Sequence, residues 1–183
     1  MSAQLQGCFT GAMSLPFVSL TAAAGDILAA MRAPVYAQKL DPGTRRLVGD
    51  RTVVLENDQD WEAHLVEGIW VVQRSDRFYL FYSGNDFSTP EYGTGVAVAT
   101  SLLGPYRKMD RPLLRSTAEW AGPGHPSVAQ GPDGGPWLFL HAFFPGQAGY
   151  KRFRALLAVP VSFERVEWRF GEGPGGPYTK HAL

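Results

Sequence analysis

The chain has 183 residues, of which 45% are hydrophobic, so it is long enough to bury the core of one domain. Its 17 basic residues balance its 17 acidic residues and form no run, which excludes a strong electrostatic attraction to nucleic acid or to an anionic membrane surface. The single cysteine, Cys8, excludes an internal disulfide, so we expect packing alone to hold the fold.

The residue usage favours an all-β fold. The chain has 21 Gly and 14 Pro, and 13% of its residues are aromatic. These shares are high for a helical protein and are typical of many short strands joined by tight turns.

Residues 1–31 differ from the rest of the chain because they are small, Ala-rich and almost uncharged. Within them, LTAAAGDILAAM (residues 20–31) could sustain a few helical turns, so we expect a short helix or a poorly ordered arm. This part of the chain has no basic region before its apolar residues, and Pro16 and Asp26 interrupt them. We therefore expect neither a signal peptide nor a membrane span, which favours a cytoplasmic location.

From Ala33 onward, the pattern changes to strand-length runs that are separated by turn residues. A hairpin is predicted first, followed by two blocks of four strands in up-and-down order. The hairpin strands are expected over 34–40 and 47–56, the first block over 64–74, 78–85, 93–101 and 106–114, and the second over 125–130, 136–144, 152–161 and 163–170.

The two blocks are similar to each other. In each, a short strand precedes a polar turn and an aromatic-rich strand, as in GIWVVQRSDRFYLFYSG and GHPSVAQGPDGGPWLFLHAF. A repeat of about 40 to 50 residues with four strands is typical of one blade of a β-propeller. The first strand of each blade lines the central channel of such a fold, and Glu67 and His125 fall on or just before that strand. We therefore expect both side chains to face a ligand.

The ordered set of these segments resembles glycoside hydrolase family 43. WEAHLVEGIWVVQRSDRFYLFYSGN is similar to the family's fourth blade, and YGTGVAVATSLLGPYRK and GPGHPSVAQGPDGGPWLFLHAF are similar to the segments that follow it. The resemblance covers about residues 33–172. It implies a five-bladed β-propeller that hydrolyses xylosides or arabinofuranosides of plant polysaccharides with inversion of configuration. Residues 32–183 would form two full blades and part of a third, as in an N-terminally truncated relative.

The resemblance implies three carboxylates in the active site, and only the general-acid Glu has a match here, at Glu67. An inverting hydrolase needs an acid for the leaving oxygen and an opposed base for water, about 6.5 to 9.5 Å apart. Asp41 is a poor match for the base because it falls in a predicted turn, and nothing around Asp26 supports it as a substitute. The base is therefore expected from an unidentified Asp or from a neighbouring subunit.

Aromatic and acidic residues near Glu67 are candidates for contact with a carbohydrate substrate. Phe87 and Tyr92, in the loop after the aromatic strand, are placed either to stack on a sugar ring or to anchor the loop. Glu62 is placed either to hydrogen-bond a sugar hydroxyl or to face solvent. Its neighbour Trp61 is placed either to line the pocket or to pack in the core.

Two basic residues match positions of the family's pocket. Arg154 resembles an arginine that reaches the pocket from the final blade, although Arg152 fits the same strand face. His125, in GPGHPSV, matches a histidine that contacts a hydrated metal ion in several members. No carboxylate is near it in sequence, so a hydrogen-bonding role or contact through water with calcium or another hydrated cation is favoured over direct ligation of the metal, with no cofactor required. His141, in FLHAF, is expected to be structural.

An incomplete set of blades leaves exposed edge strands, which tend to pair with other chains. Residues 1–31 can fold back over such an edge, or copies of the chain can associate, and we expect a homo-oligomer. The alternative function is that of a catalytically weak or inactive relative, which binds carbohydrate and assembles through its open propeller edges.

Overall fold

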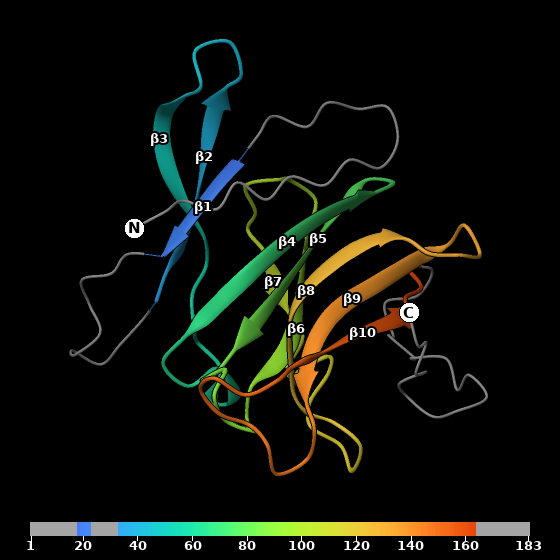
Figure 1. Ribbon diagram of the computed structural model, residues 1–183. Coiled ribbons are helices and arrows are strands. Elements are labelled where there is room, and N and C mark those ends of the chain that lie inside the picture. Colours follow the sequence, from blue (N-terminus) through green and yellow to red (C-terminus); the bar gives the residue numbers. More distant parts are fainter. Residues whose placement is uncertain (1–17, 23–32, 164–183) are drawn as a thin grey trace.

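The computed structural model describes residues 18–22 and 33–163. Within these ranges the regular elements are ten β-strands and one turn of 3₁₀ helix, η1 (Asp60–Glu62). The strands form three antiparallel sheets that follow one another across the molecule (Figure 1). The all-β prediction is therefore confirmed for the described residues. None of them lies in a helix that is long and apolar enough to cross a bilayer.

The first sheet has the order β1-β2-β3. It consists of β1 (Val18–Ala22), β2 (Val35–Asp41) and β3 (Arg46–Leu55). The predicted DPGTRR turn lies between β2 and β3, where Asp41 accepts hydrogen bonds from the Thr44 hydroxyl at 2.8 Å and the Gly43 amide at 2.9 Å. These bonds hold the pKa of Asp41 below its usual range. Asp41 thus closes a hairpin turn, as its sequence context indicates.

Strand β1 lies in the segment that the sequence assigns to an arm or a helix. It pairs antiparallel with β2, from Val18 opposite Lys39 to Ala22 opposite Val35. The predicted helix is therefore wrong for residues 20–22. Pairing with the edge strand β2 satisfies their backbone hydrogen bonds, and this outweighs their helix propensity. The rest of that helix lies outside the described residues. Part of the N-terminal segment does cover a sheet edge, which is one of the two expected arrangements.

The second and third sheets correspond to the two predicted blocks. The second has the order β4-β5-β6-β7 and consists of β4 (Val66–Arg74), β5 (Arg77–Gly84), β6 (Gly93–Ala99) and β7 (Arg107–Lys108). The third has the order β10-β9-β8 and consists of β8 (Ala121–Gln130), β9 (Pro136–Phe143) and β10 (Ala155–Pro160). The predicted last strand, over 163–170, lies outside the described residues except for its first position.

Strand β7 is much shorter than the strand predicted over 106–114. Pro112 cannot donate a backbone hydrogen bond to the ladder, so a regular strand does not continue through it. Beyond β7 the chain follows β6 through separate contacts instead. The Met109 amide donates a hydrogen bond to the Val96 carbonyl at 3.1 Å, and Leu114 forms an isolated β-bridge with Thr94.

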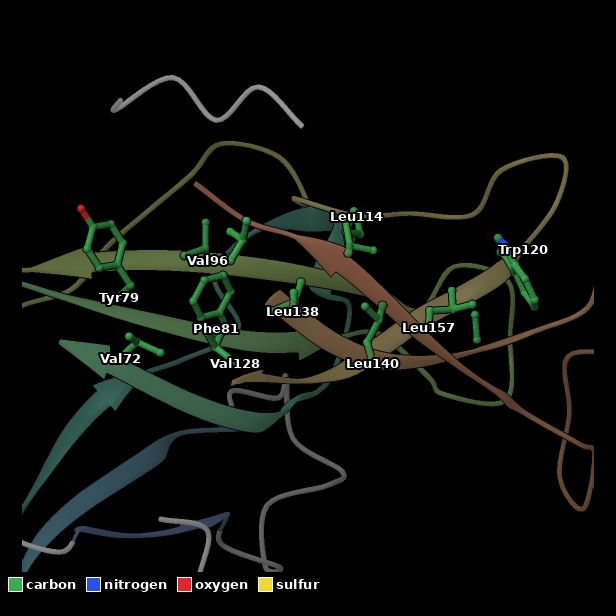
Figure 2. Packing of buried hydrophobic residues seen from close by; sticks show 13 residues of the cluster. Val72, Tyr79, Phe81, Val96, Leu114, Trp120, Val128, Leu138, Leu140 and Leu157 are labelled. Atoms are coloured by element: carbon green, nitrogen blue, oxygen red, sulfur yellow. The ribbon is translucent and has the colours of Figure 1, made fainter. Parts of the chain in front are cut away.

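Two apolar clusters hold the three sheets together. One joins the first sheet to the second and includes Val35, Leu55 and Val66. The other joins the second sheet to the third through residues such as Phe81 and Leu138, neither of which has exposed surface (Figure 2). Burying one such side chain stabilises the fold by roughly 1.5 to 3 kcal/mol. The sheets therefore pack in chain order, as the blades of a propeller do.

Candidate functional site

The inner strand of the second sheet, β4, is bulged next to Glu67. Glu67 pairs with Ser83 and Trp70 pairs with Phe81, so β4 has one more residue than β5 between these pairs. Gly68 lies in the bulge with φ at 61°, a left-handed conformation that glycine adopts without steric cost. A Cβ at Gly68 would lie 3.2 Å from Cα of His125. The bulge therefore brings β4 into close contact with β8 beside Glu67.

The inner strand of the third sheet, β8, is bulged at His125. His125 has φ at 56°, and the ladder between β8 and β9 shifts register on the two sides of Gly124. The His125 amide donates to Oγ of buried Ser83 at 2.7 Å, which ties this bulge to β5. The side chain of His125 is half-buried. A strained non-glycine conformation that the surrounding structure holds in place is typical of functional sites.

The carboxyl group of Glu67 is held by Tyr92. Glu67 is half-buried, and the Tyr92 hydroxyl donates a hydrogen bond to its Oε1 at 2.7 Å. Tyr92 has no exposed surface, and a Cβ at Gly124 would lie 2.0 Å from its ring. The predicted stacking of Tyr92 on a sugar ring is therefore wrong, because its ring is enclosed by protein. Burial and the charge of Glu67 raise the pKa of Tyr92, so the phenol stays protonated and remains a donor.

His141 joins Tyr92 to Arg154. The rings of His141 and Tyr92 stack with centroids 6.0 Å apart, and His141 also stacks against His125 at 6.2 Å. Burial lowers the pKa of His141 to about 4, and the charges of Arg154 and His125 act in the same direction. A neutral imidazole accepts a hydrogen bond, and Arg154 Nη1 lies 3.0 Å from His141 Nε2. We call Glu67, Tyr92, His125, His141 and Arg154 the Glu67 cluster.

Phe87 lies at the margin of the Glu67 cluster. Its ring centroid is 5.8 Å from the guanidinium carbon of Arg154 and 5.0 Å from the centroid of Tyr150, with the two aromatic rings edge to face. The side chain is half-buried. Its predicted stacking on a sugar ring stays a prediction, and so does contact of Arg154 with substrate.

Glu62 has no exposed surface and belongs to a structural network. Lys108 Nζ lies 2.7 and 2.8 Å from its two oxygens, and the Tyr82 hydroxyl donates to Oε1 at 2.6 Å. The amides of Asp58 and Gln59 donate to Oε2 at 2.9 and 3.1 Å. The predicted hydrogen bond from Glu62 to a sugar hydroxyl is therefore wrong, because protein donors occupy both oxygens.

Trp61 is half-buried and packs against neighbouring protein groups. Its indole Nε1 donates to Gln59 Oε1 at 2.6 Å, and its ring lies 5.7 Å from that of Tyr82. A Cβ at Gly84 would lie 2.7 Å from the Trp61 ring. Trp61 therefore packs in part against the apolar cluster of the first and second sheets, and its contact with substrate stays a prediction.

The described residues do not form a metal-binding cluster. Within 18–22 and 33–163 there is no group of three or more His, Cys, Asp or Glu side chains that could hold a metal ion. Calcium binds about six to eight oxygen ligands, so His125 beside His141 does not suit direct ligation. Contact of His125 with a hydrated cation stays a prediction. The partner carboxylate of Glu67 is also unassigned, since Asp26 lies outside the described residues.

Comparisons with known proteins support the fold described above. Residues 22–169 match the family model of glycosyl hydrolases family 43. The chain is similar to the crystal structure of a thermostable family-43 glycoside hydrolase, with 26% identity and a TM-score of 0.74 over 86% of this chain and 53% of that one. Together with the three sheets, this likeness confirms the predicted partial β-propeller. The search of curated proteins found no match.

Two further solved structures show the same fold. The chain is similar to an α-L-arabinofuranosidase from Lactobacillus brevis, with 21% identity and a TM-score of 0.67 over 85% of this chain and 55% of that one. It is also similar to an endo-1,4-β-xylanase from Bacteroides thetaiotaomicron, with 21% identity and a TM-score of 0.63 over 71% of this chain and 46% of that one. The chain thus spans about half the length of each of these structures.

Proposed function

We propose that this chain, which belongs to glycosyl hydrolases family 43, hydrolyses xylosides or arabinofuranosides of plant polysaccharides with inversion of configuration. The observation that carries the proposal is the setting of Glu67, a half-buried carboxyl group beside a bulge of an inner strand with one oxygen held by Tyr92. The names of two similar structures, an α-L-arabinofuranosidase and an endo-1,4-β-xylanase, support this substrate class.

In the proposed reaction Glu67 is the general acid. The Tyr92 hydroxyl donates to Oε1, which leaves Oε2 to carry the proton toward the glycosidic oxygen. As the bond between that oxygen and the anomeric carbon breaks, the proton of Glu67 moves to the leaving oxygen. A base takes a proton from water, whose oxygen attacks the anomeric carbon from the opposite face. We propose that this base comes from a carboxylate outside the described residues or from a neighbouring subunit.

We propose that the other members of the Glu67 cluster orient the sugar. Arg154 and His125 carry N–H donors for sugar hydroxyl groups, and Phe87 offers an aromatic ring at the margin. The hydrogen bond of Arg154 to neutral His141 limits the positions that the guanidinium can take. Such support reduces the entropy that substrate binding costs.

The test is hydrolysis of xylobiose and arabinobiose, whose sugar leaving groups must be protonated as they depart, by the wild type and by Glu67→Gln. Removal of the general acid is expected to lower kcat by roughly 10² to 10⁴ fold. Glu119→Gln, at an exposed glutamate, is the matched control and is expected to keep wild-type activity. Equal activity of Glu67→Gln and the wild type would exclude the catalytic role. Proton NMR of the first product formed reports whether the anomeric configuration inverts.

A second candidate is a catalytically weak or inactive relative that binds carbohydrate. It is favoured by the described residues, among which Glu67 has no assigned partner carboxylate to act as the base. Calorimetric titration with xylohexaose and arabinohexaose distinguishes the two candidates. Binding by a wild type that hydrolyses no more than Glu67→Gln would support this second candidate.

A further inference from the structure

The loop between β9 and β10, residues 144–154, exposes large aromatic side chains beside the Glu67 cluster. The exposed fraction is 68% for Tyr150, 70% for Phe153 and 36% for Phe144. Exposed apolar groups that gather in one place mark binding surfaces more often than single exposed residues do. We call these three side chains the aromatic platform.

The two most exposed rings are each supported by another ring. Tyr150 packs edge to face against half-buried Phe87, with centroids 5.0 Å apart and an interplanar angle of 81°. Phe153 stacks on Phe144 at 6.2 Å and 14°, and Phe144 packs against buried Trp120 at 5.3 Å. This support limits the motion of the exposed rings. Stacking of a ligand on them therefore costs less side-chain conformational entropy.

Side-chain contacts join the aromatic platform to the Glu67 cluster. Phe87, which supports Tyr150, lies 5.8 Å from the guanidinium carbon of Arg154. Arg154 follows Phe153 directly in sequence and contacts His141 of the cluster at 3.0 Å. The platform therefore continues the surface on which the scissile glycosidic bond is proposed to lie.

The chemistry of the loop suits a carbohydrate. Lys151 and Arg152 lie between the two most exposed rings, their residues are exposed, and residues 144–154 include no Asp or Glu. Aromatic faces stack on the C–H faces of sugar rings, and N–H donors bind the hydroxyl oxygens at their edges. The loop therefore combines both kinds of contact that a sugar unit offers.

We propose that Tyr150 and Phe153 bind additional sugar units of the same chain whose glycosidic bond lies at Glu67. The preferred substrate is then an oligosaccharide or polysaccharide rather than a single glycoside. The inference rests on the proposed function for the location of the cleaved bond, but the binding does not itself require cleavage.

The test uses titration calorimetry of the full chain with Glu67→Gln, so that the ligand is not consumed. Xylobiose is compared with xylohexaose, and arabinobiose with arabinohexaose. At least one hexaose is expected to bind roughly tenfold tighter than its biose. Tyr150→Ala and Phe153→Ala are each expected to lower the affinity for that hexaose roughly two- to tenfold. Affinity for the biose should stay unchanged, and Tyr150→Trp should retain the affinity for the hexaose.

The control variant is Leu103→Ala, at a side chain that is 44% exposed in the connection between β6 and β7. It is expected to leave both affinities unchanged. Equal affinity for biose and hexaose, or an unaltered hexaose affinity in both alanine variants, would overturn the proposal. A double alanine variant that alters the sedimentation coefficient but not the affinity would also overturn it, since the platform would then join copies of the chain. Failure of the proposed function is read separately, from wild-type hydrolysis compared with Glu67→Gln.

Discussion

The Tyr92 hydroxyl donates a hydrogen bond to Glu67 Oε1 at 2.7 Å from a side chain that has no exposed surface. Because the donor is enclosed, packing against residues such as His141 sets its position, and solvent does not compete for it. The carboxyl group of Glu67 is therefore oriented before any sugar binds. Orientation of this kind is worth most when the proton must pass to one particular oxygen.

Tyr92→Phe is expected to lower kcat about tenfold or more while KM changes little. The variant keeps the ring that stacks on His141 and removes only the hydroxyl that orients Glu67, and a loss of about 1.4 kcal/mol of transition-state stabilisation corresponds to a tenfold fall in rate. Steady-state kinetics on arabinobiose and xylobiose, whose leaving groups require a proton, measure both constants. Tyr106→Phe is the matched control, because its hydroxyl donates to the Leu102 carbonyl outside the Glu67 cluster. A similar fall in both variants, or none in Tyr92→Phe, would contradict a positioning role.

The different positions of Glu62 and Glu67 show what the sequence motif can predict. The sequence correctly predicts the inner strand with Glu67 near its start, because the strand-length apolar run and the turn residues after it are local signals. The environment of Glu62 depends on Lys108 and Tyr82, which are 46 and 20 residues away. No local pattern specifies which of two acids meets a distant lysine, so burial of Glu62 could not be predicted from the sequence.

The same limit explains the omission of His141 and the error at Tyr92. The sequence predicts β5, β6 and β9 to within about two residues, because turn residues delimit them. The stacking of Tyr92 on His141 instead depends on how the third sheet packs against the second, since His141 lies on β9 and Tyr92 directly precedes β6. One observation could have placed His141 in the site: it pairs with Gly124, the residue before His125, across the ladder between β8 and β9. That pairing is known only once the register of the sheet is known.

Lys108→Met is expected to destabilise the fold by about 3 to 5 kcal/mol, because it leaves the buried carboxylate of Glu62 without its cation. Urea unfolding followed by far-UV circular dichroism measures the free energy of unfolding. The double variant with Glu62→Gln is expected to lose less than the sum of the two single losses, because the unpaired charge is gone. Lys39→Met, at an exposed lysine, is the control. A loss below about 1 kcal/mol in Lys108→Met would contradict the role of this ion pair.

A homo-oligomer is expected from the outer strand of the first sheet. β3 stands at the end of the order β1-β2-β3, and it carries Leu47, Val48 and Val53 with exposed fractions of 47, 37 and 45%. Apolar residues on an edge strand favour pairing with another chain, and a lysine there opposes it. Sedimentation at micromolar concentration should therefore give a multiple of the 20.0 kDa chain mass. Val48→Lys with Val53→Lys should shift the protein toward the monomer, and a wild type that sediments only as a monomer would contradict the prediction.

His141 is expected to make stability fall as the solution becomes acidic. Burial lowers its pKa from 6.5 to about 4, so between these values the unfolded chain binds a proton that the folded chain does not. The stability that neutral His141 contributes is therefore complete above about pH 6.5 and decreases as the pH falls toward 4. His141→Gln removes this group, so its urea midpoint should fall less between pH 7.5 and pH 4.5 than that of the wild type. His64→Gln, at an exposed histidine, should follow the wild type. Parallel decreases in all three proteins would show that His141 does not resist protonation in the folded state.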